Sequence, residues 1–335
     1  MCILNERQQP LVSVVIPAYQ AAGRIRETLN SVFAQTYPNV EVVLVNDGSP
    51  DTGALEEAIR SYGERLIYIR QENRGPSGAR NTAIRAARGK YIACLDSDDI
   101  YLPEHLARLV PLLEERSLDL VYSDSYVTRD GVHVGRSFER QPQTPPVTFE
   151  KLITEECAIT TSAVVASRQA MIDAGLFDER YRCSEDYDLW VRMSFRGAKM
   201  DLLLQVGIEH RLLPDGLASD GYLLKQAQIE VNNKVLATLP VSVKQKTLIQ
   251  EQIVRTEGLS QMDLVKRYLR EGRYPEARVA AGKAVALLQD RRSRRVALAV
   301  GIAPWAVRRF LRMQEARLAQ KGKRALPLKP IPKTK

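Results

Sequence analysis

The sequence lacks the short motifs that mark several large enzyme classes. No Gly-x-Gly-x-x-Gly follows the first predicted strand and no Gly-x-x-x-x-Gly-Lys-Ser/Thr segment occurs, which argues against a nicotinamide dehydrogenase and a P-loop nucleotidase. Histidine is scarce, with 3 residues in 335, and no Gly-x-Ser-x-Gly elbow is present, which removes the usual acyl-transfer triads. Any chemistry is therefore expected to depend on carboxylates and a metal ion.

Cysteines and long apolar runs are also few. No apolar run reaches the roughly 18–20 residues that a membrane-spanning helix needs, and the longest candidate, 296–307, contains Pro304. The residues after Met1 do not follow a signal-peptide pattern. The four cysteines have neither paired nor metal-type spacing: Cys2, Cys94, Cys157 and Cys183. We therefore expect the protein in the reducing cytoplasm.

Charge is distributed unevenly along the chain. Residues 221–335 hold 25 Lys and Arg against 8 Asp and Glu, a net charge of +17, whereas residues 1–220 carry a net charge of −8. An acidic front part and a basic rear part are expected to meet different partners.

Strands and helices are predicted to alternate through the front part of the chain. The predicted strands are 11–16, 40–45, 66–69, 91–95 and 119–122, and the predicted helices are 23–35, 52–62, 77–88 and 103–116. Near-continuous apolar strands that alternate with helices indicate an α/β fold, with a mostly parallel central sheet and helices on both faces.

Only helices are predicted from about residue 221 onward, over 222–238, 246–270 and 275–289. The segment 271–277 is typical of the turn in a helical hairpin, and one copy of a helical repeat is the alternative. We expect three parts: a catalytic domain over 1–220, a helical region over 221–290, and a basic amphipathic tail over 291–335 with a disordered end.

Polar clusters follow three of the predicted strands, where ligands bind in parallel sheets. They are Pro17-Ala18-Tyr19, Asn46-Asp47-Gly48-Ser49 and Asp96-Ser97-Asp98-Asp99. Three carboxylates in four positions repel one another, so the last cluster favours a hard divalent cation such as Mg²⁺ or Mn²⁺. A solvated acidic turn is the alternative.

Two further segments carry candidate site residues. Arg80 lies in a Gly-bearing loop, 75–81, that runs into a helix, from which it can reach a nucleotide. Carboxylates at 185, 186 and 188 open a predicted helix, where the helix dipole favours negative charge. One of them could act as a general base, although acidic residues at a helix start are common in any case.

Taken together, five ordered segments resemble the inverting glycosyltransferases of family 2, which have a GT-A type nucleotide-sugar fold. The resemblance covers residues 11 to about 220 and rests on segments 12–19, 45–49, 75–81, 96–99 and 184–188.

This resemblance implies a nucleotide-diphosphate sugar, a UDP-sugar above all, as donor, and a glycan or lipid-linked acceptor. Pro17, Ala18, Tyr19, Asp47 and Arg80 would line the nucleotide site, Asp96 and Ser97 would face the ribose or sugar, and Asp98 would hold Mg²⁺ or Mn²⁺. Asp186 matches the catalytic base, and 158–165 matches an acceptor-side element.

The chain departs from the family pattern at one point. Leu213 stands where the family often places a histidine two residues past Arg211. His210 could substitute for it as a metal ligand, but we favour a packing role for this residue.

The basic tail, residues 291–335, interleaves arginines with Trp305, Phe310 and aliphatic residues. This composition suits an anionic membrane surface, so we expect a cytoplasmic enzyme that is peripheral at the inner face of the membrane. A helix packed on the catalytic domain is the alternative, and no nucleic-acid motif accompanies the charge.

Two other functions are alternatives to the transferase. A non-catalytic sugar-nucleotide-binding subunit of a glycan assembly complex would not need carboxylates at 98 and 186. A nucleotidyltransferase would need a Gly/Arg/Lys-rich loop after the first strand, which residues 17–20 do not provide.

Overall fold

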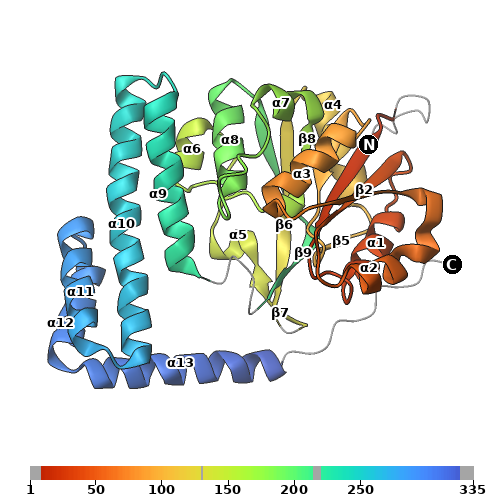
Figure 1. Cartoon of the computed structure of the whole chain (residues 1–335). Helices are drawn as coiled ribbons and strands as arrows, with labels where there is room; N and C mark the ends of the chain where they lie inside the picture. Colours follow the sequence, from red (N-terminus) through yellow and green to blue (C-terminus); the bar gives the residue numbers. More distant parts are fainter. Residues whose placement is uncertain (1–8, 130, 214–219, 325–335) are drawn as a thin grey trace. The chain divides into compact units, whose positions relative to one another are not determined.

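The computed structural model describes residues 9–129, 131–213 and 220–324, and the chain divides into two compact units (Figure 1). Unit 1 comprises Met1–Thr128 and Gly135–Arg211, and unit 2 comprises Arg129–Val134 and Leu212–Lys335. The three-part division predicted from the sequence stays a prediction, and the end of its tail, 325–335, lies outside the described residues.

The described strands form one nine-stranded mixed sheet in the order β3-β2-β1-β4-β8-β6-β9-β5, with β7 paired to β6. The strands are β1 (Val12–Ala18), β2 (Val40–Asp47), β3 (Leu66–Gln71), β4 (Tyr91–Cys94), β5 (Ile100–Tyr101), β6 (Leu120–Arg129), β7 (Val132–Arg136), β8 (Val164–Ser167) and β9 (Met200–Leu212). The β3-β2-β1-β4 half is parallel, as the strand–helix alternation predicts. The β4–β8, β6–β8 and β5–β9 pairs are antiparallel, and the sequence patterning did not predict β9, the 13-residue strand.

Both faces of the sheet are covered. Val14, Val15 and Ile16 follow one another in β1 and are all fully buried. Because successive residues of a strand point to opposite faces, this burial requires packing on each side. Helix α3 packs on β1 and β2, and α4 packs on β8.

The helices of unit 1 are α1 (Ile25–Phe33), α2 (Thr52–Ile59), α3 (Gly75–Ala86), α4 (His105–Glu115), α5 (Ser137–Arg140), α6 (Phe149–Ile153), α7 (Arg168–Asp173) and α8 (Glu185–Phe195), with 3-10 turns η2 (Arg60–Arg65) and η3 (Thr161–Ala163). Helices α1 to α4 and α8 match the helices predicted from the sequence, whereas α5, α6 and α7 were not predicted. Ile25, Leu29 and Val32 lie on one face of α1 and are buried, as apolar residues at this spacing should be.

A buried carboxylate ties together the amino ends of β1 and β2. Glu41 Oε1 accepts hydrogen bonds from Ser13 Oγ at 2.5 Å and from the Arg88 backbone N–H at 2.6 Å, and Arg88 Nε donates to Oε2 at 2.8 Å. Burial alone would raise the pKa of Glu41, but these donors outweigh it and lower the pKa below its ordinary value.

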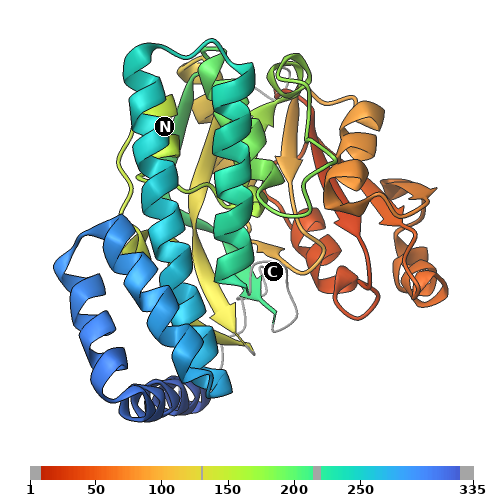
Figure 2. The same ribbon diagram turned by 60° about the vertical axis from the view of Figure 1, so that its left-hand side comes forward.

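From Gly221 onward the described part of unit 2 is helical, as predicted. Its helices are α9 (Gly221–Thr238), α10 (Val243–Glu271), α11 (Tyr274–Leu288), α12 (Arg291–Ile302) and α13 (Pro304–Arg324). Helix α10 packs against both α9 and α11, and α12 packs against α11 (Figure 2). Gly272 ends α10 with φ of +81°, a backbone conformation that favours glycine. None of the described helices is long and apolar enough to cross a bilayer.

Candidate active site

The predicted site residues gather at one edge of the sheet because three parallel neighbours end there. β1 lies between β2 and β4, with Ala18 opposite Asn46 and Val15 opposite Cys94. The loops that follow these strands therefore leave from the same edge. This edge carries Pro17, Ala18 and the half-exposed Tyr19, then Asp47, and then Asp96, Ser97, Asp98 and Asp99.

Asp47 is the last residue of β2 and is buried. Its Oδ1 accepts hydrogen bonds from Gln71 Nε2 at 2.7 Å and from the Arg74 backbone N–H at 2.9 Å. The turn that follows needs Gly48, which has φ of +64° and would place a Cβ 2.7 Å from the Asn73 backbone nitrogen. The turn thus holds the Asp47 carboxylate in one orientation at the sheet edge.

Arg80 joins two segments that are far apart in the sequence. Its Nη2 donates to Asp96 Oδ1 at 2.6 Å and its Nη1 to Glu185 Oε1, also at 2.6 Å. The guanidinium is buried and lies over the Phe177 ring, 5.4 Å from its centroid. Burial raises the pKa of Glu185, and the charge of Arg80 opposes this shift. Arg80 therefore links the loop after β4 to the start of α8.

Asp186, the predicted base, lies in the first turn of α8 beside Glu185. Thr161 Oγ1 donates to its Oδ2 at 2.5 Å, and its own Oδ1 accepts from the Tyr187 backbone N–H at 2.7 Å. The adjacent Ser162 accepts a hydrogen bond from the Asp96 backbone N–H through its Oγ at 3.1 Å. The η3 turn, which falls within the segment matched to the acceptor-side element, thus contacts both Asp186 and the loop after β4.

Asp98 and Asp99 have different surroundings. Burial, Asp99 and Asp96 together raise the pKa of Asp98 to about 6, because each of them disfavours its charged form. Asp99 is buried and accepts from the Arg211 backbone N–H at 2.8 Å and pairs with His210 Nδ1 at 3.1 Å. Asp98 is therefore the carboxylate of this loop that most needs a cation.

The sequence favours a packing role for His210, but the structure places its ring in an ion pair with Asp99. Burial would lower its pKa, yet Asp99, with Asp96 and Asp98, raises the pKa of His210 to about 9. The Asp99 carboxylate therefore favours the charged form of the ring and holds it in an ion pair. The contact follows from the register of β5 and β9, in which Ile100 lies opposite Glu209.

Within the described residues, no group of three or more His, Cys, Asp or Glu side chains is arranged to hold a metal ion by itself. A cation at this edge would therefore take part of its coordination from oxygen atoms of a bound molecule. The loop after β4 fits such a cation, because its donors are carboxylate oxygens and Asp98 lies close to the carboxylates of Asp96 and Asp99 in the same loop.

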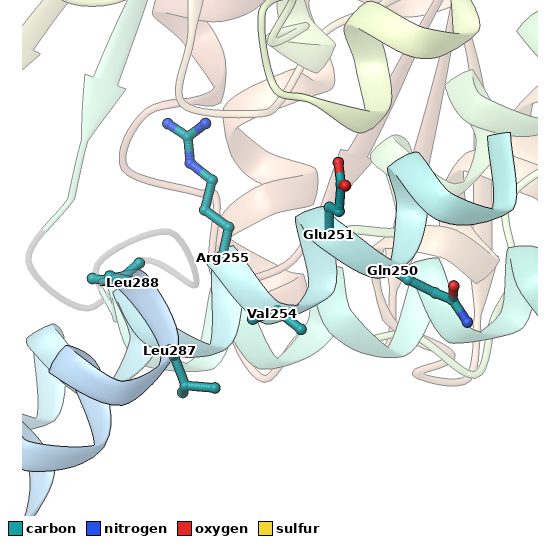
Figure 3. Close-up of a pocket in the computed structure, with 6 residues that line it drawn as sticks. All are labelled: Gln250, Glu251, Val254, Arg255, Leu287 and Leu288. Carbon is teal, nitrogen blue, oxygen red and sulfur yellow. The ribbon is translucent and has the colours of Figure 1, made fainter. Parts of the chain in front are cut away.

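A hollow in unit 2 does not belong to this site. It has a volume of about 440 Å³ and is lined by Gln250, Glu251, Val254 and Arg255 of α10 and by Leu287 and Leu288 of α11 (Figure 3). None of the residues predicted to bind the donor lines it.

The sheet order and the carboxylates at its edge define an enzyme fold of the GT-A type. A family model described as Glycosyl transferase family 2 matches residues 13–181. The chain belongs to this family.

Two relatives and one solved structure illustrate the match. An uncharacterized glycosyltransferase of Rickettsia bellii is 29% identical over 291 residues, which cover 84% of this chain and 40% of the relative. WfaP of Escherichia coli, named UDP-Glc:alpha-D-GlcNAc-diphosphoundecaprenol beta-1,3-glucosyltransferase, is 31% identical over 191 residues, 56% of this chain and 72% of WfaP.

The mannosyltransferase PcManGT of Pyrobaculum calidifontis, solved in complex with GDP-Man and Mn²⁺, shares the fold with a TM-score of 0.62 at 20% identity. This likeness covers 93% of this chain and 85% of PcManGT. The chain spans less than half the length of the first rickettsial relatives.

Proposed function

We propose that this chain is an inverting glycosyltransferase that moves a sugar from a nucleotide-diphosphate sugar to an acceptor hydroxyl in cell-envelope or exopolysaccharide synthesis. The observation that carries the proposal is the link between the loop after β4 and the start of α8. Arg80 bonds to both Asp96 and Glu185, and the η3 turn bonds to both Asp96 and Asp186. These contacts bring a donor-binding loop and a candidate base into one network.

The donor would lie across the carboxyl ends of β1, β2 and β4. Pro17, Ala18 and the half-exposed Tyr19 would contact the base, and Asp47 would accept from a nucleobase N–H through its Oδ2, since its Oδ1 is engaged. Asp96 and Ser97 would face the ribose or sugar. Arg80 would contribute to the nucleotide site indirectly, through its hydrogen bond to Asp96. The printed donors of WfaP and PcManGT, UDP-Glc and GDP-Man, support a nucleotide sugar, and we favour a UDP-sugar.

Asp98 would hold Mg²⁺ or Mn²⁺ through its carboxylate. When bound, the cation would supply Lewis-acid stabilisation of the negative charge on the departing nucleoside diphosphate. The Mn²⁺ in the PcManGT complex supports this assignment. His210 and Arg211 hold Asp99 in place next to Asp98.

Asp186 would remove the proton from the acceptor hydroxyl. Thr161 donates to Oδ2 and the Tyr187 backbone N–H donates to Oδ1, and these two hydrogen bonds orient the carboxylate. Attack from the face opposite the leaving group inverts the anomeric centre, so no covalent enzyme nucleophile is needed.

The acceptor would be a glycan or a lipid-linked glycan. The printed name of WfaP, which acts on a diphosphoundecaprenol-linked sugar, supports the lipid-linked class. The proposal places the enzyme in the cytoplasm, peripheral at the inner face of the membrane, where such an acceptor and a nucleotide sugar can meet.

The test of Asp186 separates catalysis from binding. With the donor found by screening nucleotide sugars for slow hydrolysis, Asp186→Asn should lower turnover by about 10²–10⁴-fold while the calorimetric Kd for the donor changes little. Thr161→Val should lower turnover less, and Asp173→Asn, a change at an exposed carboxylate of α7, should leave it unchanged. Full activity of Asp186→Asn would refute the role of the base.

The same calorimetry tests the metal. Mg²⁺ or Mn²⁺ should tighten donor binding to the wild type, and a chelator should abolish that gain. Asp98→Ala should bind the donor equally weakly with and without metal. Donor affinity that chelator leaves unchanged in the wild type would overturn the metal assignment, and donor binding without hydrolysis or transfer would favour the non-catalytic subunit.

A further inference from the structure

We propose that the exposed sides of α12 and α13 form a docking surface for a bilayer that contains anionic phospholipids. We call this surface the tail face. It deepens the proposed peripheral location by naming the contact residues, and it rests on that location alone, not on the transfer chemistry. The tail face consists of Arg291, Arg295, Leu298, Ile302, Trp305, Arg309, Arg312 and Met313.

The α12 part of the tail face is a single stripe. Arg291, Arg295, Leu298 and Ile302 are spaced i, i+4, i+7 and i+11, which places them on one side of a helix. Leu298 is 65% exposed and Ile302 is 74% exposed. The opposite side of α12 is already used, because Val300 there is buried in the hydrophobic core of unit 2.

The α13 part continues the pattern directly after Pro304. Trp305, Arg309, Arg312 and Met313 recur at helical spacing and are all exposed, with Trp305 at 64%. The side of α13 that bears Val307 and Leu311 packs against the core of unit 2. Both helices are therefore held by one apolar side and present a second, exposed side that mixes arginines with large apolar residues.

The charge of this segment points to an anionic partner. Residues 291–314 hold seven arginines and no acidic residue. Arg308 is turned inward, where its Nη2 donates to the Arg270 carbonyl at 3.0 Å. Among the described residues, Arg291, Arg295, Arg309 and Arg312 have no ion-pair partner, so their charges are available to a ligand.

A bilayer explains the combination better than the other occupants of such a surface. Exposed Trp and aliphatic side chains beside arginines match the interface between headgroups and acyl chains, where apolar area and anionic charge lie within a few ångströms. A second copy of the chain would set arginines against arginines, which costs free energy. The polypeptide would lie on the membrane, since no described helix can span it.

The experiment uses the full chain and vesicles of phosphatidylcholine with or without phosphatidylglycerol. Trp305 is a built-in probe, because the second tryptophan, Trp190, is buried in unit 1 and 1% exposed. Anionic vesicles should shift the emission to the blue and co-sediment the protein, and neutral vesicles should do neither. In Trp305→Phe the emission shift should disappear while sedimentation persists.

Paired substitutions separate the apolar and charged contributions. Leu298→Gln with Ile302→Gln should weaken partitioning at least tenfold at any salt concentration. Arg291→Gln with Arg295→Gln should weaken it roughly fivefold per arginine at low salt, and less at high salt. The matched control, Lys244→Gln with Lys246→Gln on α10, removes the same charge from two exposed positions and should leave partitioning unchanged.

Three results would overturn the proposal. They are equal binding to neutral and anionic vesicles, an equal loss of binding in the lysine control, and a change of oligomeric state in the Leu298 and Ile302 variant with vesicle binding intact. The last result would assign the tail face to a second copy of the chain. Because no donor or acceptor is present in these assays, their failure would leave the proposed transfer reaction untouched.

Discussion

Removing the guanidinium of Arg80 should destabilise unit 1 more than it alters any donor contact. Arg80→Met keeps most of the side-chain length over the Phe177 ring but leaves the carboxylates of Asp96 and Glu185 without their shared cation. Glu185 is buried, so its carboxylate cannot recover the lost hydrogen bond from bulk water.

The expected cost follows from this burial. Breaking a buried ion pair by removing one partner costs about 3–5 kcal/mol, a large share of the roughly 5–15 kcal/mol that stabilises a typical domain. The cost should depend on pH. A buried carboxyl whose pKa is raised in the folded state stabilises the fold below its unfolded pKa and loses that contribution as pH rises through the folded pKa. Without Arg80 the folded-state pKa of Glu185 should be raised further. The variant should therefore lose less stability relative to the wild type near pH 5 than near pH 8.

Urea unfolding measures the loss of stability. A Trp305→Phe background leaves Trp190 as the single tryptophan, and its ring packs edge-on against Phe177 at 6.0 Å between centroids, so its emission reports on unit 1. Adding Glu185→Gln to Arg80→Met should restore part of the loss, because it removes the unpaired charge. Arg85→Met, at an exposed position of the same helix, is the control. A loss below about 1 kcal/mol, or no rescue, would refute the reasoning.

Three further predictions concern stability. Glu41→Gln should lower the free energy of unfolding by about 1–3 kcal/mol near neutral pH. Because the folded-state pKa of Glu41 is lowered, the stabilities of wild type and variant should converge as pH falls through that pKa. A pH-independent difference would contradict this reasoning. Gly207→Ala should cost about 1–3 kcal/mol by urea unfolding, because the added methyl group collides with the ring of buried His105, and a neutral result would mean that β9 can shift. Gly272 has φ of +81°, so Gly272→Ala should lower stability in thermal unfolding by about 1 kcal/mol. Gly282 lies in open space within α11, so Gly282→Ala should raise stability by about 0.5–1 kcal/mol. Equal effects of the two substitutions would argue against strain at the turn.

The sequence alone determined the local part of this protein. Apolar runs and helical spacing predict β1 to β4, α1 and α3, and helices α9 to α11, because these patterns depend on residues a few positions apart. The placement of Asp47 and Asp98 at one sheet edge followed as well, since Asp47 ends the parallel strand β2 and Asp98 lies in the loop that follows the parallel strand β4. The resemblance to family 2 glycosyltransferases, which the family model confirms, rests on the same segments.

Only the tertiary structure decided which side chains meet across the site. Periodicity carries no information on pairings between distant segments, so it could not show that β9 runs beside β5 and brings His210 to Asp99. It also could not show that Arg80 is buried between two carboxylates, one of them 105 positions away in the sequence. A charge removed from water needs a partner, and packing of the whole chain selects that partner.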